Sequence, residues 1–62
     1  MKKPKVRLVG EDGNIFNLMG ITAKALKKAG LEKEKKEMMD KIIRARSYNE
    51  ALQIIEKYVE VE

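Results

Sequence analysis

The stretch from Gly10 to Leu31 constrains the fold most, because it is a tight polar turn followed by one strongly punctuated helix. At about 100° per residue, its apolar side chains cover well over half of the helix circumference. They are Ile15, Phe16, Leu18, Met19, Ile21, Ala23, Ala25, Leu26 and Ala29, with Thr22 among them. A helix that is apolar over so wide an arc is contacted from more than one side, so we expect it to be the central helix of the fold.

Local signals mark both ends of this helix. Asn14 is the expected N-cap, because its side-chain oxygen can accept a hydrogen bond from an amide of the first turn. Gly30 is expected to be left-handed after the last turn, which makes Leu26 and Leu31 the apolar pair of a Schellman ending. Gly20 is the one local inconsistency, and a glycine in mid-helix suggests either close approach of another backbone or a kink.

Two further helices are predicted after Leu31. Over 32–46, opposite charges recur four residues apart in the order that supports a helix. These pairs are Glu32 with Lys36, Glu37 with Lys41 and Asp40 with Arg44. Ser47 then begins a third helix, because Glu50 three residues later completes an S-x-x-E capping box. A broad apolar face follows as far as Val59.

Both ends of the sequence alternate charged and apolar residues, as strands do. The alternating segments are KVRLV at 5–9 and YVEVE at 58–62. If they pair, the basic residues of the first lie beside Glu60 and Glu62, and opposite charges on neighbouring strands attract. The alternation leaves open whether the pairing is parallel or antiparallel. We therefore predict a single α+β domain over 1–62 with the order β-α-α-α-β, in which three helices pack against a two-stranded sheet formed by the chain ends.

The length and two missing residue types exclude several classes of protein. Sixty-two residues suffice for one domain, near the lower limit for a fold that a hydrophobic core alone stabilises. The sequence has no cysteine and no histidine, which excludes a disulfide framework, thiolate chemistry and the commonest metal ligand. The basic N-terminal segment lacks the hydrophobic run of a signal peptide, and no apolar run approaches the length of a membrane span. We expect a cytoplasmic protein without membrane association.

No catalytic constellation is recognisable, so we expect no enzymatic activity and no cofactor or metal. Glu11 and Asp12 are the closest approach to an acid–base pair, but they lie in a turn expected to be exposed, where nothing separates their pKa values. The turn precedes a helix, as phosphate-binding loops do, yet its carboxylates repel anions and it lacks the P-loop spacing. The turn is also much shorter than the calcium-binding loop of an EF-hand. The expected role of the turn is to join a strand to a helix.

Three segments together resemble a group of small bacterial proteins, several of them encoded by phages and other mobile elements. The segments are LVGEDGNIFNLMG at 8–20, ALKKAG at 25–30 and ARSYNEALQIIEKYVEV at 45–61. The group carries a strand-GxDGNxF turn, an ALxxAG helix end and a closing DYDxxL-like helix. Because the group has no established activity, the resemblance implies one domain and supplies no catalytic residues. At 48–50 this sequence departs from the two acidic positions of that pattern.

The distribution of charge supports one functional hypothesis. Residues 1–46 carry thirteen Lys and Arg against six Asp and Glu, while residues 47–62 carry one Lys against four Glu. The basic part either forms an electrostatic footprint for nucleic acid, attracts the acidic end of the same chain, or is a solvated surface. The candidate nucleic-acid contacts are Lys2, Lys3, Lys5, Arg7, Lys24, Lys27 and Lys28. Because arginine is scarce, such binding is expected to be mainly electrostatic.

A protein-interaction module is the function that we favour from the sequence. The apolar arcs of the three helices are wider than so small a domain is expected to bury, and leftover apolar surface marks self-association or docking on a larger protein. The candidate contacts are Phe16, Ile21, Met38, Met39, Ile43 and Ile54, and the helix over 32–46 is the expected contact surface. The alternative is that these residues close a compact core. The resemblance implies that the chain is an accessory factor of a mobile element.

Overall fold

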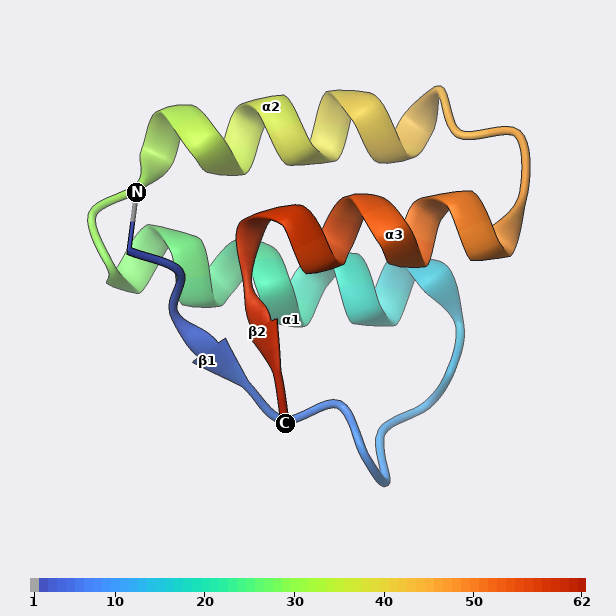
Figure 1. Cartoon of the computed structure of the whole chain (residues 1–62), viewed down its shortest axis with the longest axis horizontal. Helices are drawn as coiled ribbons and strands as arrows, with labels where there is room; N and C mark the ends of the chain where they lie inside the picture. The colour runs from blue at the N-terminus through green and yellow to red at the C-terminus, as the bar shows by residue number, and fades with distance from the viewer. Residues whose placement is uncertain (1) are drawn as a thin grey trace.

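The computed structural model describes residues 2–62, and its elements follow the predicted order (Figure 1). They are β1 (Lys5–Val6), α1 (Ile15–Lys28), α2 (Glu32–Ile43), α3 (Tyr48–Tyr58) and β2 (Glu60–Val61). The two strands come from the two ends of the chain and pair with each other. The predicted α+β fold, with three helices and a two-stranded sheet, is therefore confirmed.

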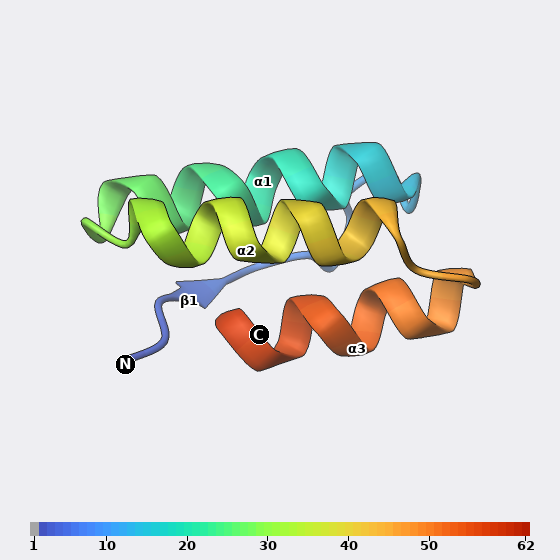
Figure 2. The same cartoon turned by 90° about the horizontal axis from the view of Figure 1, so that it is seen from above.

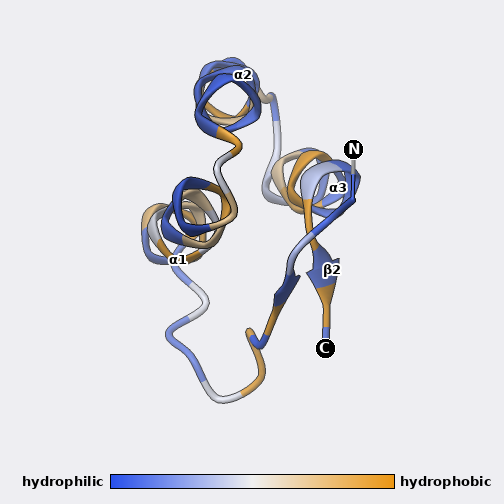
Figure 3. Ribbon diagram, turned by 90° about the vertical axis from the view of Figure 1, so that its left-hand side faces the viewer, coloured by the Kyte–Doolittle hydropathy of each residue, from blue (hydrophilic) through white to orange (hydrophobic). Residues whose placement is uncertain are grey.

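The three helices form the body of the molecule and the sheet lies along one side of it. Figure 2 shows α1 and α2 running in opposite directions, with α3 alongside them. Seen along their axes in Figure 3, the helices occupy the corners of a triangle, and the strands lie opposite α2. The helix α1 contacts α2, α3 and β1, as its wide apolar arc predicts, and α3 likewise contacts three elements. The core is thus enclosed by helices above and by the strands below.

Each helix contributes a completely buried apolar side chain to the centre of the core. Leu26 of α1, Met38 of α2 and Ile55 of α3 are all 0% exposed. Val6 of β1 and Val59, which precedes β2, are buried against them. The two ends of the chain therefore help to close the hydrophobic core, because they supply valine side chains that would otherwise be in water.

The core contains two residues that the sequence suggested as partner contacts. Met38 and Ile54 are buried, so the prediction that they form part of a contact surface is wrong. The reason is that α2 packs against α1 on one side and α3 on the other. A helix with two neighbours needs a broad apolar arc to cover both contacts, so the width of the arc does not by itself indicate a surface for a partner.

The ends of α1 have the geometry that the sequence predicts. The backbone N–H of Phe16 donates to Oδ1 of the N-cap Asn14 at 2.8 Å. At the other end, Gly30 has φ +76°, and the N–H of Leu31 donates to the carbonyl of Leu26 at 2.9 Å, which is the Schellman hydrogen bond. These bonds satisfy backbone groups that a helix end leaves without intrahelical partners.

The helix α2 is shorter than predicted, because it ends at Ile43 rather than at residue 46. The N-cap at Ser47, which the sequence predicts, explains the difference. Ser47 accepts a hydrogen bond from the N–H of Glu50 at 3.1 Å and has the extended backbone of an N-cap, with φ −153°. The chain must therefore leave the helical conformation before Ser47, and residues 44–46 provide the reversal into α3.

The i,i+4 charge pairs on α2 are realised only in part. Arg44 lies 3.5 Å from Asp40, as predicted, whereas Glu32 pairs with Lys35 at 3.2 Å instead of with Lys36. The ammonium of Lys41 lies 5.3 Å from the centre of the Tyr58 ring and joins α2 to α3. A side-chain hydrogen bond with Tyr58 is the main cause that raises the pKa of Lys41. These exposed charges contribute little to stability.

The sheet is parallel, which the sequence left open. Lys5 lies opposite Glu60 and Val6 opposite Val61. The N–H of Glu60 donates to the carbonyl of Pro4 at 2.9 Å, and the N–H of Glu62 to the carbonyl of Val6 at 2.8 Å. The register brings opposite charges of the two chain ends to adjacent positions, so attraction between the ends accounts for part of the charge asymmetry.

Truncation at the C-terminus should destabilise the fold, and the loss of stability should depend on whether Val59 is removed. Removing residues 59–62 should lower Tm by about 10 °C or more, because burial of a valine is worth about 1.5–3 kcal/mol and each kcal/mol shifts Tm by about 4–8 °C in so small a domain. Removing residues 60–62 retains Val59 and should cost less. Thermal unfolding followed by circular dichroism measures both, and a chain without 59–62 that melts like the full chain contradicts the role of β2.

Gly20 should be replaceable at a gain in stability. Nothing lies within 4 Å of the place where its Cβ would stand, so close approach of another backbone, one of the two explanations that the sequence suggested, is wrong. Gly20→Ala should raise the free energy of unfolding by about 0.5–1 kcal/mol, because it removes conformational freedom from the unfolded chain. The control is Gly30→Ala, which should destabilise because φ is +76° there. Urea unfolding measures both, and a Gly20→Ala chain that is less stable than the parent contradicts the interpretation.

Candidate interaction site beside the sheet

The chain after β1 forms a loop below α1 and α3 (Figure 1). Within it, the N–H of Glu11 donates to the carbonyl of Leu8 at 3.1 Å, which closes a turn. Gly10 occupies the third position of this turn with φ +86°, a backbone conformation that glycine adopts without strain. Val9 is left at the corner of the turn, where it is 71% exposed. The turn thus holds an apolar side chain in water.

The second half of the loop is fixed by polar side chains. The N–H of Asn14 donates to Oδ1 of Asp12 at 3.0 Å, and Nδ2 of Asn17 donates to the carbonyl of Asp12 at 2.9 Å. The hydroxyl of Tyr48, at the start of α3, donates to the carbonyl of Gly13. Because these bonds reach both α1 and α3, the loop is attached at two places to the helical body.

Tyr48 is a residue of this site that the sequence analysis does not single out. It is 47% exposed, and its hydroxyl donates to the carbonyl of Gly13, 35 residues away in sequence. A tyrosine in the first turn of a helix carries a usable signal, since its hydroxyl requires a partner when the ring packs on the protein. The identity of that partner is a long-range contact, which the sequence alone does not give.

The loop, α3 and β2 enclose an apolar cleft of about 330 Å³, which we call the β2 cleft. It is lined by Leu8, Val9, Glu11, Gly13, Leu18, Tyr48, Leu52, Ile55, Glu56 and Val61. Leu18 and Ile55 are core side chains, so the cleft reaches down to the core. Leu8 and Leu52 are half-buried. Most of the lining is hydrocarbon, and the two glutamates supply negative charge.

Exposed apolar residues gather at this cleft. The large apolar side chains that remain most exposed in residues 2–62 are Val9, Phe16, Ile43, Tyr48 and Val61. Of these, Val9, Tyr48 and Val61 line the β2 cleft, and Val61 is 43% exposed although it belongs to a strand. Residues that are distant in sequence thus form one apolar surface, which periodicity within single elements does not reveal.

The remaining predicted contact residues are divided between surface and interior. Phe16 and Ile43 are 70% and 71% exposed, while Ile21 and Met39 are half-buried. Phe16 lies at the start of α1 and Ile43 at the end of α2, which Figure 1 shows at the same end of the molecule. Ile43 therefore keeps the exposure that a contact residue needs, but α2 as a whole does not offer a broad apolar surface.

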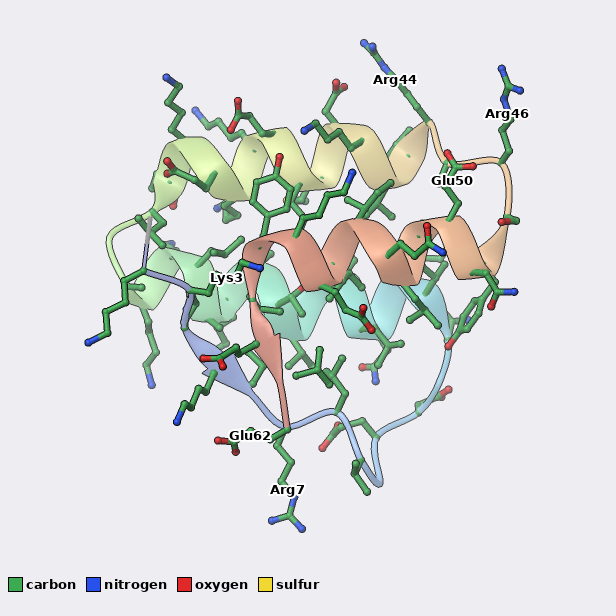
Figure 4. The ribbon with its side chains drawn as sticks, viewed as in Figure 1. Lys3, Arg7, Arg44, Arg46, Glu50 and Glu62 are labelled. Atoms are coloured by element: carbon green, nitrogen blue, oxygen red, sulfur yellow. The ribbon has the colours of Figure 1, made fainter. Side chains whose placement is uncertain are left out.

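The predicted nucleic-acid contacts are all exposed. Lys2, Lys3 and Lys5 line a shallow depression together with Ala29, which directly follows the lysines of the last turn of α1. The structure thus brings two basic segments to one end of the molecule. Lys3 Nζ donates to the carbonyl of Glu56 at 3.1 Å, and Figure 4 shows Lys3 beside α3, whereas Arg7 lies with Glu62 at the lower end of the sheet.

Residues 2–62 contain no group of three or more acidic side chains placed to hold a metal ion. Nor do they contain a helix that is long and apolar enough to cross a membrane. No protein-family model, curated protein or solved structure matches this chain. The geometry of the described residues is therefore the basis for the functional proposals below.

Proposed function

We propose that this chain is a non-catalytic interaction module that docks on another protein through the β2 cleft. The observation that carries the proposal is the gathering of Val9, Tyr48 and Val61 around an apolar cleft that reaches the core. An apolar surface that a small domain leaves uncovered is typical of a binding site, because covering it on association removes it from water. The resemblance to proteins of phages and mobile elements supports an accessory role in such an element.

The fixed loop also favours docking at the cleft. One wall is held in place by the Asp12 contacts and by the hydroxyl of Tyr48, while the other walls are α3 and β2. A preformed site loses less conformational entropy on binding than one that must be ordered by its partner. The walls of the cleft are thus in place before a partner binds.

Site-specific photo-crosslinking tests this function. A photoreactive amino acid placed at Val9 should give a discrete crosslinked product in the native host, and one at Lys33, on the outer surface of α2, should not. The product should disappear when Leu52→Lys places a charge in the cleft, because burial of an unpaired ammonium is strongly unfavourable. Circular dichroism establishes that Leu52→Lys is folded.

The same experiment decides between the two predicted surfaces. A product from a probe at Ile43, with no product from a probe at Val9, would replace the cleft by the end of α2 as the contact surface. The exposure of Ile43 makes a probe at that position compatible with a folded monomer. Light scattering after size exclusion distinguishes a second copy of this chain from a foreign partner. Absence of a product at both positions would contradict an interaction role.

Mainly electrostatic binding of nucleic acid is the alternative function. It is supported by the basic end, which we define as Lys2, Lys3, Lys5, Lys27 and Lys28. A concentrated set of lysines releases counterions when it neutralises phosphates, and this term alone supports non-specific binding. Glu60 lies in the same depression and opposes such binding, so we place this function second.

Fluorescence anisotropy with duplex DNA and with single-stranded RNA tests the alternative. Binding should be measurable at low salt and fall steeply toward physiological salt, since phosphate contacts dominate it. The double variant Lys27→Gln with Lys28→Gln should weaken it, whereas Lys33→Gln with Lys36→Gln on α2 should have a smaller effect. An absence of binding at low salt removes this function, and binding that persists at high salt would place it first.

A further inference from the structure

We infer that the β2 cleft receives an extended segment of a foreign protein, which adds as a third strand to β2 and carries alternating apolar and basic side chains. The inference rests on the proposed interaction function and names the class of its partner. It is supported by the open edge of β2, the apolar lining beside that edge and the acidic side chains that surround both.

The edge of β2 that faces away from β1 keeps backbone groups for a further strand. The N–H groups of Glu60 and Glu62 are used in bonds to β1. Because successive residues of a strand direct their backbone groups to opposite edges, the N–H and carbonyl of Val61 point away from β1. Val61 also lines the cleft. A peptide strand laid there can form backbone hydrogen bonds with Val61, which is β-augmentation.

The inner face of such a strand would meet the apolar part of the cleft. Side chains alternate between the two faces of a sheet, and the inner face of this sheet is the one where Val6 is buried. Below β2, the cleft presents Leu18, Leu52 and Ile55. Every second residue of the incoming segment is therefore expected to be apolar, since it enters a hydrocarbon environment.

The outer face of the added strand would meet negative charge. Glu60 and Glu62 flank Val61 and are exposed, and Glu11 and Glu56 line the cleft itself. The nearby cations are Lys5, opposite Glu60 on β1, Arg7, which lies with Glu62 at the lower end of the sheet, and Lys3, which contacts the carbonyl of Glu56. Lys5 and Arg7 belong to the β1 side of the sheet, so the free edge of β2 carries the acidic side chains of the pair. Cross-strand attraction then favours Lys or Arg at the alternate positions of the partner.

The same charges disfavour pairing between two copies through β2. A symmetric contact would place Glu60 and Glu62 of both copies on adjacent strands, and like charges in such positions are destabilising. Short edge strands with charged residues also resist non-specific strand addition. The acidic edge thus acts selectively, because it repels the chain's own β2 and accepts a basic segment.

A matched pair of peptides tests the inference. The probe is the fluorescein-labelled peptide KVRVKVR, and its control EVEVEVE keeps the valines but reverses the charges. The basic peptide should bind the full chain about tenfold more tightly or better at low salt and lose affinity as salt rises. Amide NMR should show shifts at Val9, Leu52 and Val61. Equal affinity for both peptides, or shifts confined to the end of α2, would overturn the inference.

Two further tests isolate the strand pairing. Val61→Pro removes the outward N–H but leaves the bonds of Glu60 and Glu62 to β1, and it should weaken KVRVKVR about three- to tenfold, the loss expected for one hydrogen bond. The matched control Val61→Thr keeps the N–H, so it should bind KVRVKVR more tightly than Val61→Pro does. A KVRVKVR peptide that is N-methylated at alternate residues lacks the backbone N–H groups that an added strand needs, so it should bind poorly to the unaltered chain. This test does not depend on the stability of the Val61 variants.

The outcomes distinguish failure of this inference from failure of the proposed docking function. If the N-methylated peptide binds as well as the unmodified one, no strand is added and the inference is wrong, while crosslinking at Val9 still decides whether the cleft docks a partner. If crosslinking at Val9 fails but KVRVKVR binds with the expected shifts, the strand chemistry holds and the module function requires revision. Light scattering with and without peptide shows whether a second copy takes part.

Discussion

The pairing of the two chain ends is the interaction on which the rest of the structure depends. Two backbone hydrogen bonds, from Glu60 to Pro4 and from Glu62 to Val6, hold β2 against β1. They also hold Val6 and Val59 over the helices, where both valines are buried. A parallel pair requires a crossover connection, and here three helices provide it. In a domain of this size the hydrophobic core provides little stability beyond what folding requires, so the burial of Val6 and Val59 by the chain ends matters for the stability of the fold.

The β2 cleft is a consequence of that arrangement. Because β1 is parallel to β2, the chain leaves β1 at the far side of the sheet and must return to the start of α1 through a loop. The loop carries Leu8 and Val9 past α3 without covering Leu52 or Val61 completely. The hydroxyl of Tyr48 ties the loop to the start of α3, so this contact fixes one wall of the cleft.

The sequence predicts this fold well where the determining interactions are local. Asn14, Gly30 and Ser47 cap their helices through contacts within a few residues, and each has the predicted geometry. It predicts the site poorly because burial and the cleft depend on contacts between distant segments. The apolar arc of α2 predicts surplus apolar surface, but a second neighbouring helix covers Met38. The contact of Tyr48 with the loop also has no counterpart in periodicity or capping signals.

The fold also places basic and acidic side chains on different surfaces, which the sequence alone does not show. The basic residues near the N-terminus lie beside the end of α1, because β1 runs past it. Glu60 is the acidic residue that lines the depression there. Glu11 and Glu56 instead line the cleft, together with Val61. A ligand that is drawn to the lysines is therefore repelled at the cleft, and a basic segment has the opposite preference. The two candidate functions consequently use different surfaces, and a charge change at one of them leaves the other intact.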